Sequence, residues 1–122
     1  MTPPRKPRNL SPGEIIHLTF EHNAHHDTAG SRYALVVSEA DFNKSGRALV
    51  CPITQGQANQ RDTHGTWFVS LMNAGTSVQG IVLTNQVKSI DWRARDVTTN
   101  GELVDPRTLQ EVRDILAAIL GI

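Results

Sequence analysis

The chain of 122 residues carries 12 Lys and Arg against 12 Asp and Glu, which gives a formal net charge of zero at pH 7. This length predicts one domain that buries a core without covalent staples, and the single cysteine, Cys51, excludes an internal disulfide framework and a Cys-based zinc cage. A lone cysteine favours a reducing compartment, so we expect a cytoplasmic protein. No apolar run approaches the ~20 residues that span a bilayer, and we expect no membrane partner.

The zero charge is a cancellation along the chain. Residues 1–8 carry three basic residues and no acid (net +3), whereas residues 96–122 carry two basic and five acidic residues (2 − 5 = −3). Because association with polyanions depends on local potential as well as on net charge, a nucleic-acid partner is not excluded. We expect residues 1–12 to form a basic, Pro-rich flexible arm that contributes no core, followed by a single domain over residues 13–122.

Short runs of alternating or β-branched apolar residues predict strands along most of the chain. Over residues 14–21, Ile16 and Leu18 alternate with Ile15 and His17, which predicts a half-buried strand. Further strands are expected at residues 33–38, 48–53, 66–71, 80–84, within 86–95 and at 96–102, with polar loops at 22–31 and 55–65 and turns at 43–46 and 73–75.

The final stretch predicts one amphipathic helix of about 14 residues. Asp105 suits the N-cap, Pro106 suits the first helical position, apolar residues recur at helical spacing, and Gly121 ends the pattern. Six or seven short strands followed by one helix predict a small curled antiparallel sheet or barrel with a packed helix. Since aromatic residues make up only 5% of the chain, dimerisation is expected to complete a thin core.

The loop ending at Arg32 is the first candidate site, because His22, His25, His26 and Asp27 precede this arginine closely. Three interpretations stay open: a solvated polar loop, a metal site, or a group for acid–base and electrostatic catalysis. Adjacent histidines without a further His or Cys pattern argue against the metal, and we expect no metal or other cofactor. The guanidinium of Arg32, at the junction of the loop and an apolar strand, is suited to bidentate phosphate binding.

Two further segments combine polar and basic residues with strand ends. Thr54 ends a strand and offers either a β-forming side chain or a hydroxyl for a substrate oxygen, and Gln55 and Arg61 lie in the following loop, which is either merely polar or able to contact single-stranded RNA. In residues 85–95, basic residues flank Trp92, which predicts either stacking on nucleic acid or a buried indole. Cys51, inside an apolar strand, is expected to be packed rather than reactive.

Together these segments resemble the MazF/PemK family of toxins from bacterial type II toxin–antitoxin systems. The resemblance covers about residues 13–120 in order, through Gly13-Glu14, Asp27 to Arg32, Ala40-Asp41-Phe42-Asn43, Pro52-Ile53-Thr54 and Gln86-Val87-Lys88-Ser89-Ile90-Asp91-Trp92-Arg93-Ala94-Arg95. The last of these is the most specific. Pro52 to Gly56 together with Asn85 to Val87 look similar to the ChpB branch of the family.

The resemblance implies a mainly β fold, an SH3-like β-barrel of six to seven strands with a C-terminal helix, working as a homodimer. It implies a sequence-specific, ribosome-independent and metal-independent endoribonuclease that cleaves single-stranded mRNA, and a cognate MazE-like antitoxin with an acidic tail. Two other readings stay open: a non-enzymatic toxin on the same scaffold, like the gyrase-binding CcdB relatives, and a plain small barrel that binds nucleic acid or protein.

Residue by residue, the resemblance implies that Arg32 and Thr54 hold the scissile phosphate while Asp27 or His26 acts as, or orients, the general base. The side chains expected to contact RNA are Gln55, Arg61, Asn85, Gln86 and Lys88. Three positions depart from the family pattern: Tyr33 replaces the usual Pro, Thr28 replaces Gln, and Asn85 replaces an Asp proposed to act in catalysis. An amide cannot serve as a proton-transfer base, so Asn85 is expected only to orient RNA.

Overall fold

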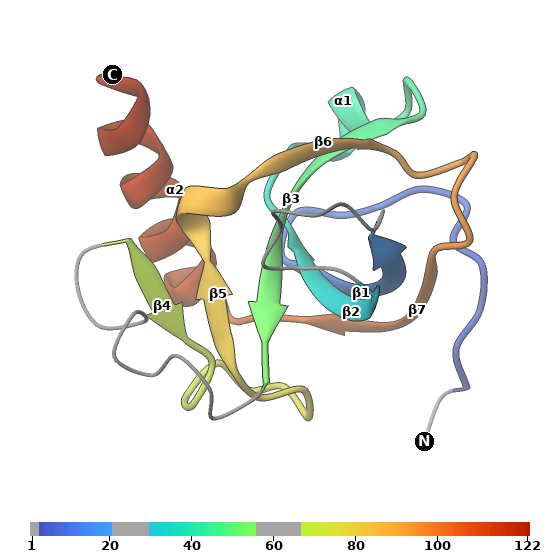
Figure 1. The fold of residues 1–122 in the computed structure, drawn as a ribbon, viewed down its shortest axis with the longest axis horizontal. Coiled ribbons are helices and arrows are strands. Elements are labelled where there is room, and N and C mark those ends of the chain that lie inside the picture. The colour runs from blue at the N-terminus through green and yellow to red at the C-terminus, as the bar shows by residue number, and fades with distance from the viewer. Residues whose placement is uncertain (1–2, 21–29, 56–66) are drawn as a thin grey trace.

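The computed structural model describes residues 3–20, 30–55 and 67–122. Seven short strands, one short helix and one long C-terminal helix make up this part of the chain (Figure 1). In chain order they are β1 (Glu14–Phe20), β2 (Gly30–Val36), α1 (Ala40–Asn43), β3 (Arg47–Thr54), β4 (Phe68–Ser70), β5 (Ile81–Leu83), β6 (Lys88–Asp91), β7 (Thr98–Leu103) and α2 (Pro106–Leu120). The strands expected from the sequence are therefore present, with shifted ends; the short helix α1 was not anticipated.

All strand pairings are antiparallel, in the order β4-β5-β3-β2-β1-β7, and β6 pairs with the same edge of β3 as β5 does. The mainly β architecture with a C-terminal helix is confirmed. Helix α2 packs at the side of the sheet that carries β4, away from the N-terminus (Figure 1). The described pairings leave β4 and β7 as the two ends of the path, so closure into a barrel stays a prediction.

Side chains alternate across the curled sheet into two apolar clusters. We call the first the helix-side core; it contains Ile15, Leu35, Val37, Cys51, Ile53, Val69, Leu71, Ala74, Val78, Val82, Val104 and Val112. We call the second the arm-side core; it contains Leu10, Ile16, Leu18, Ala34, Val36, Ala48, Val50, Ile90, Trp92 and Val97. Strand β1 contributes to both through Ile15 and Ile16, so its first part is buried on two faces. Further along, His17 is half-buried and Thr19 is exposed, as expected of a half-buried strand.

Helix α2 begins and ends as the sequence predicts. The Asp105 carboxylate accepts a hydrogen bond of 2.8 Å from the backbone N–H of Thr108, and Gly121 ends the helix with a φ of 75°, a value in the left-handed region that glycine adopts without steric cost. The first part of its apolar stripe packs against the helix-side core, whereas Ile119 and Leu120 at its end are 41% and 69% exposed.

The N-terminal segment takes part in the fold, so the expectation that residues 1–12 contribute no core is wrong for Leu10. This side chain is fully buried in the arm-side core. Further out, Arg5 and Thr99 exchange two backbone hydrogen bonds of 2.9 Å, which add the segment to the outer edge of β7. Flexibility of the arm stays a prediction.

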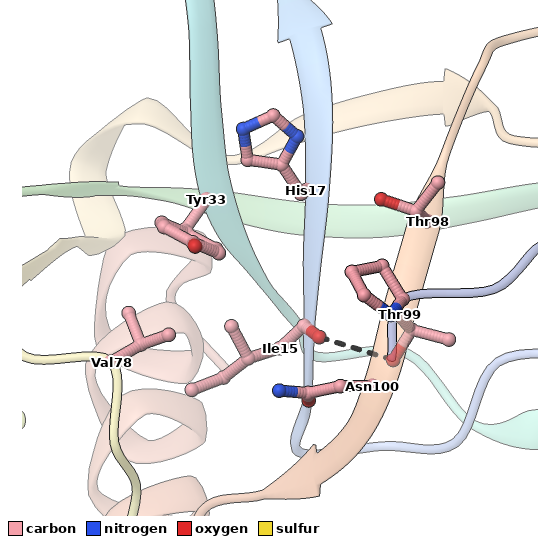
Figure 2. A pocket seen from close by; sticks show the side chains of 8 residues that line it. Ile15, His17, Tyr33, Val78, Thr98, Thr99 and Asn100 are labelled. Atoms are coloured by element: carbon pink, nitrogen blue, oxygen red, sulfur yellow. Dashed lines mark hydrogen bonds between the residues drawn. The ribbon is translucent and has the colours of Figure 1, made fainter. Parts of the chain in front are cut away.

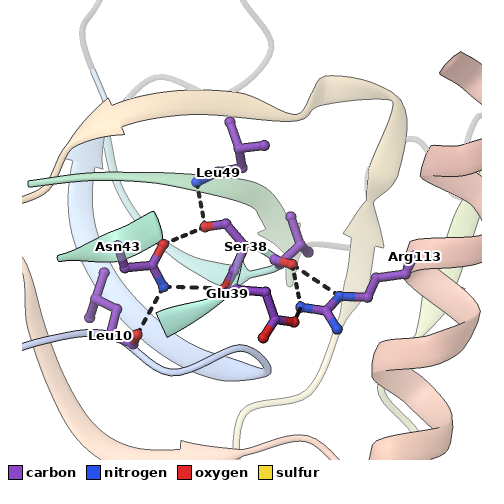
Figure 3. Close-up of polar contacts among 7 residues, drawn as sticks. Leu10, Ser38, Glu39, Asn43, Leu49 and Arg113 are labelled. Carbon is purple, nitrogen blue, oxygen red and sulfur yellow. Dashed lines mark hydrogen bonds and ion pairs between the residues drawn. The ribbon is translucent and has the colours of Figure 1, made fainter. Parts of the chain in front are cut away.

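A buried amide explains how the segment and α1 are held. The Asn43 side chain donates to the backbone carbonyls of Leu10 and Ser38 and accepts from the Ser38 hydroxyl (Figure 3). The backbone carbonyl of Asn43 in turn accepts from the indole N–H of Trp92 at 2.9 Å. The side chain and backbone of one residue thus satisfy polar groups from several segments, which a buried site requires.

Candidate functional site

Arg32 and Thr54 come together through the register of two neighbouring strands. Strands β2 and β3 pair with Tyr33 opposite Ile53 and Ala34 opposite Pro52. Continued by one residue, this register sets Arg32 opposite Thr54, and directly opposed residues of antiparallel strands have Cβ atoms about 5 Å apart. Two side chains separated by 22 positions in the sequence therefore lie next to each other on one face of the sheet.

That face is the arm-side face, and the pair lies where its apolar core ends. Arg32 also pairs with Leu18 of β1, a buried member of the arm-side core. Arg32 and Thr54 are both half-buried. A guanidinium and a hydroxyl at the rim of an apolar core are restrained in position yet accessible, the arrangement that preorganised binding of an anion needs.

The position of Thr54 is supported by a close backbone approach from Gly80. A Cβ atom added to Gly80 would lie 2.3 Å from the Thr54 carbonyl oxygen, and Gly80 has a φ of +143°. Both observations favour glycine at this position. Thr54 also pairs with Ile81 of β5, so the end of β3 is held from both neighbours.

The predicted RNA-contacting residues of segment 85–88 lie further along β3. Strand β5 pairs with β3 at Ile53 and Thr54, and β6 pairs with it again at Val50, opposite Lys88. Asn85 and Gln86 belong to the 3-10 turn Thr84–Gln86 between these strands, so they lie beside the middle of β3. Asn85 is exposed, whereas Gln86 and Lys88 are half-buried.

Lys88 shares the face of Arg32 and Thr54 because Val50 lies on that face. Val50 and Thr54 are four residues apart on β3, which corresponds to roughly 13 Å along a strand. Gln55 directly follows β3 and is exposed. The structure therefore brings Arg32 and Thr54 together, with Gln55 adjoining them and Lys88 at the far end of the same face.

Three of the predicted site residues, His26, Asp27 and Arg61, lie outside the described residues. So do His22 and His25, the other candidate metal ligands. Within the described ranges, no group of three or more His, Cys, Asp or Glu side chains is arranged to hold a metal ion. None of the helices in the described part of the chain is long and apolar enough to cross a membrane.

Two predicted alternatives are resolved by burial. Trp92 is only 3% exposed and donates to the Asn43 carbonyl, so the buried-indole alternative is correct and stacking on a nucleotide base is wrong. Cys51 is fully buried, and burial raises the pKa of its thiol from 9.0 to about 12. The packed, unreactive thiol is confirmed.

Sequence reasoning missed a pocket on the opposite face of β2 and β1. His17 and Tyr33 line it with their rings edge to face at a centroid distance of 5.0 Å, together with Thr99 and residues of β7 (Figure 2). The pocket has a volume of ≈ 240 Å³ and a largely apolar lining. Since Tyr33 adjoins Arg32 on a strand, their side chains face opposite sides of the sheet, so this pocket and the Arg32 site are separate.

Comparison with known proteins decides the family. A model of the PemK-like, MazF-like toxins of type II toxin–antitoxin systems matches residues 11–120. The chain belongs to this family. Endoribonuclease toxin MazF of Escherichia coli (strain K12) is 33% identical over 110 residues, which covers 89% of this chain and 92% of the relative. Endoribonuclease PemK of Escherichia coli is 33% identical over 117 residues, covering 95% and 86%. Its family and these relatives identify the chain as an endoribonuclease toxin of a type II toxin–antitoxin system.

Solved structures agree on the fold. The crystal structure of MazF from Deinococcus radiodurans superposes with a TM-score of 0.79 at 30% identity, covering 95% of this chain and 100% of that one. MazF in a MazE–MazF crystal structure from the same organism gives a TM-score of 0.73 at 28% identity, covering 95% and 99%. The MazF-like fold predicted from the sequence is confirmed.

Sequence identity alone does not decide which branch of the family this chain belongs to. Endoribonuclease toxin ChpB of Escherichia coli (strain K12) is 39% identical, but over 84 residues that cover 68% of this chain and 71% of the relative. The MazF and PemK relatives match at lower identity over longer stretches. The MazF/PemK family is therefore shown, and the ChpB branch stays a prediction.

Proposed function

We propose that this toxin cleaves single-stranded mRNA at specific short sequences, without a ribosome and without a metal ion. The ribose 2′-OH attacks its own 3′ phosphorus, the bond from phosphorus to the 5′ oxygen of the next nucleotide breaks, and the products carry a 2′,3′-cyclic (or opened 3′) phosphate and a 5′-OH. The proton of the 2′-OH passes to a general base, and the leaving 5′ oxygen takes up a proton from a general acid.

The juxtaposition of Arg32 and Thr54 carries this proposal. Charge accumulates on the non-bridging phosphate oxygens as the reaction proceeds. A guanidinium can bind such oxygens through two parallel N–H donors, and a hydroxyl can donate a third hydrogen bond. Donors fixed in advance stabilise the transition state without reorganisation, and losing one costs on the order of 10²–10³ in rate in other enzymes. The half-buried setting of both residues supports this role.

Asp27 or His26 is proposed to accept the proton of the 2′-OH. Each is a residue type that performs such transfers, and they precede Arg32 by six and five positions in the sequence. Asn85 is assigned no proton transfer because an amide has neither a suitable proton nor a basic site.

Contacts to the RNA bases and backbone are proposed for Gln55, Arg61, Asn85, Gln86 and Lys88. The position of Lys88 on the Arg32 face supports a backbone contact, and the exposed amide of Asn85 beside β3 supports hydrogen bonds to base edges.

The assembly is proposed to be a homodimer with a barrel-like protomer, belonging to the ChpB branch and acting in the cytoplasm. Apolar side chains that remain exposed on the single chain support dimerisation, among them Leu49, Val87, Ile119, Leu120 and Ile122. A MazE-like antitoxin with an acidic tail is proposed as the partner, since relatives of this chain have been crystallised with MazE.

The test is cleavage of a long RNA by the purified protein in EDTA, with the termini of the products mapped. We expect recurrent cleavage at one short sequence, a 5′-OH on each downstream fragment, and loss of cleavage for the variant Arg32→Ala. Intact RNA after long incubation with excess protein would contradict the proposal. Binding of gyrase by the same preparation would then indicate the CcdB-like alternative.

A further inference from the structure

Four cationic side chains meet at a second pocket, away from β3. Lys6 and Arg8 of the N-terminal segment and Arg93 and Arg95 of the turn after β6 line a cavity of ≈ 250 Å³, together with Pro7, Trp92 and Val97. We call it the basic pocket. Its described lining contains no carboxylate. Lys6 forms an ion pair with Asp96 at 3.5 Å, and both of these side chains are largely exposed.

The arm half of the basic pocket is held at both ends. Arg5 is bonded to Thr99 of β7 through the backbone, and Leu10 is buried in the arm-side core with its carbonyl bound by Asn43. Lys6 and Arg8 lie between these anchors. Because the backbone is fixed on both sides, less conformational entropy is lost when the two cations engage a ligand.

The turn half is fixed by packing. The buried Trp92 indole is locked by its hydrogen bond to Asn43, and the Arg93 guanidinium lies 5.1 Å from the centroid of the Trp92 ring. Arg95 donates from Nη1 to the Thr19 carbonyl at 2.9 Å. Arg93 and Arg95 therefore belong to a turn that is held in place by packing and hydrogen bonds.

The bond to Thr19 also sets where the pocket lies relative to the proposed cleavage site. In β1 and β2, Thr19 pairs with Ser31 and Leu18 pairs with Arg32. Arg95 is thus bonded to the residue of β1 next to the partner of Arg32. The basic pocket and Arg32 therefore lie at the same end of β1.

We propose that the basic pocket binds a backbone phosphate of the substrate RNA outside the scissile step, and that the N-terminal segment supplies half of this subsite. This inference rests on the proposed function, because it assigns the pocket to the same RNA strand. A compact cavity with several converging cations matches a phosphate group, which carries its charge on closely spaced oxygens. Contacts of this kind position a strand without reading its sequence.

The test compares Lys6→Gln/Arg8→Gln with the matched control Lys44→Gln/Arg107→Gln, which removes two exposed cations from α1 and from the start of α2. Binding is measured over a salt series with a fully 2′-O-methylated RNA, which cannot be cleaved by 2′-OH attack. Each phosphate contact to a single strand contributes about 0.7 to the slope of log K against log salt. We expect the slope to fall by about 0.7 for the arm variant alone, with weaker binding to every RNA sequence.

A second arm of the experiment uses RNAs shortened from either end around the mapped cleavage site. The difference between wild type and the arm variant should disappear once the strand no longer reaches the basic pocket. Equal slopes for the arm variant and the control would overturn the inference. So would an arm variant that binds RNA like the wild type and has lost only the binding of an acidic peptide such as poly-glutamate. Failure of the wild type to cleave RNA would instead count against the proposed function, since the salt slopes are measured without cleavage.

Discussion

The two cores of this protein are closed in different ways. The helix-side core is covered by a capped helix and contains an inert thiol. The arm-side core is covered by a short N-terminal segment and Trp92, and its open end carries Arg32 and Thr54. Neighbouring residues on β2 and β3 face opposite cores. Residues that pack in the helix-side core therefore alternate, along the same strands, with the face that carries the proposed catalytic residues. Four predictions test this separation.

The largest effect is expected from removing one hydroxyl on the arm-side face. Thr54→Val should lower the cleavage rate about 10²–10³-fold with little change in stability, because only a donor to the phosphate is lost. The matched control is Thr84→Val: the Thr84 hydroxyl is buried and has no hydrogen-bond partner among the described residues. Replacing it should leave cleavage unchanged and be neutral or stabilising. Equal rates for both variants would remove Thr54 from the mechanism.

The second prediction concerns how the arm-side core is closed. Leu10→Ala should destabilise the protein by about 2–5 kcal/mol, the usual cost of truncating a buried leucine. Met72→Ala, at a side chain that is 75% exposed, should change little. Urea unfolding of the two variants measures the difference. An unchanged midpoint for Leu10→Ala would mean that the arm does not close this core in solution.

These same residues show which features of the fold and of the site can be predicted from the sequence. Alternation and β-branched runs predict the strands, and Asp105, Pro106 and Gly121 predict α2, because those signals are local. The burial of both Ile15 and Ile16 depends on residues that are remote in the chain: Val78 and Val104 share the core of Ile15, and Leu10 and Trp92 share that of Ile16. The meeting of Arg32 and Thr54 depends on the register of β2 and β3, which no local pattern fixes. The family resemblance names both residues, and the strand pairing gives the physical reason to propose that they act together.

A third prediction addresses the backbone that supports Thr54. Gly80→Ala should cost about 1–3 kcal/mol, because its Cβ meets the Thr54 carbonyl and its φ is strained for alanine. Gly75→Ala shares a positive φ of +82° but has no atom within 4 Å of the new Cβ among the described residues. Cleavage should therefore fall more for Gly80→Ala when both are assayed well below their melting temperatures. The reverse order would show that Gly80 does not position the site.

The smallest effect belongs to the helix-side core and depends on pH. The Cys51 thiol has its pKa raised from 9.0 to about 12 by burial. Between these values the unfolded chain loses a proton that the folded chain keeps, so the free energy of unfolding falls as pH rises above 9.0. We expect a loss of about 1 kcal/mol from this thiol by pH 10. Urea unfolding at pH 8 and 10 should show it for the wild type and not for Cys51→Val.

The bridge between Arg5 and Thr99 has a consequence for the behaviour of the protein at high concentration. Strand β7 lies at the end of the sheet with Leu103 53% exposed, and unpaired strand edges are templates for association with other chains. By pairing with Thr99, the N-terminal segment occupies part of that edge. Removal of residues 1–8 would thus do more than delete positive charge: it would uncover a strand on which aggregation can begin.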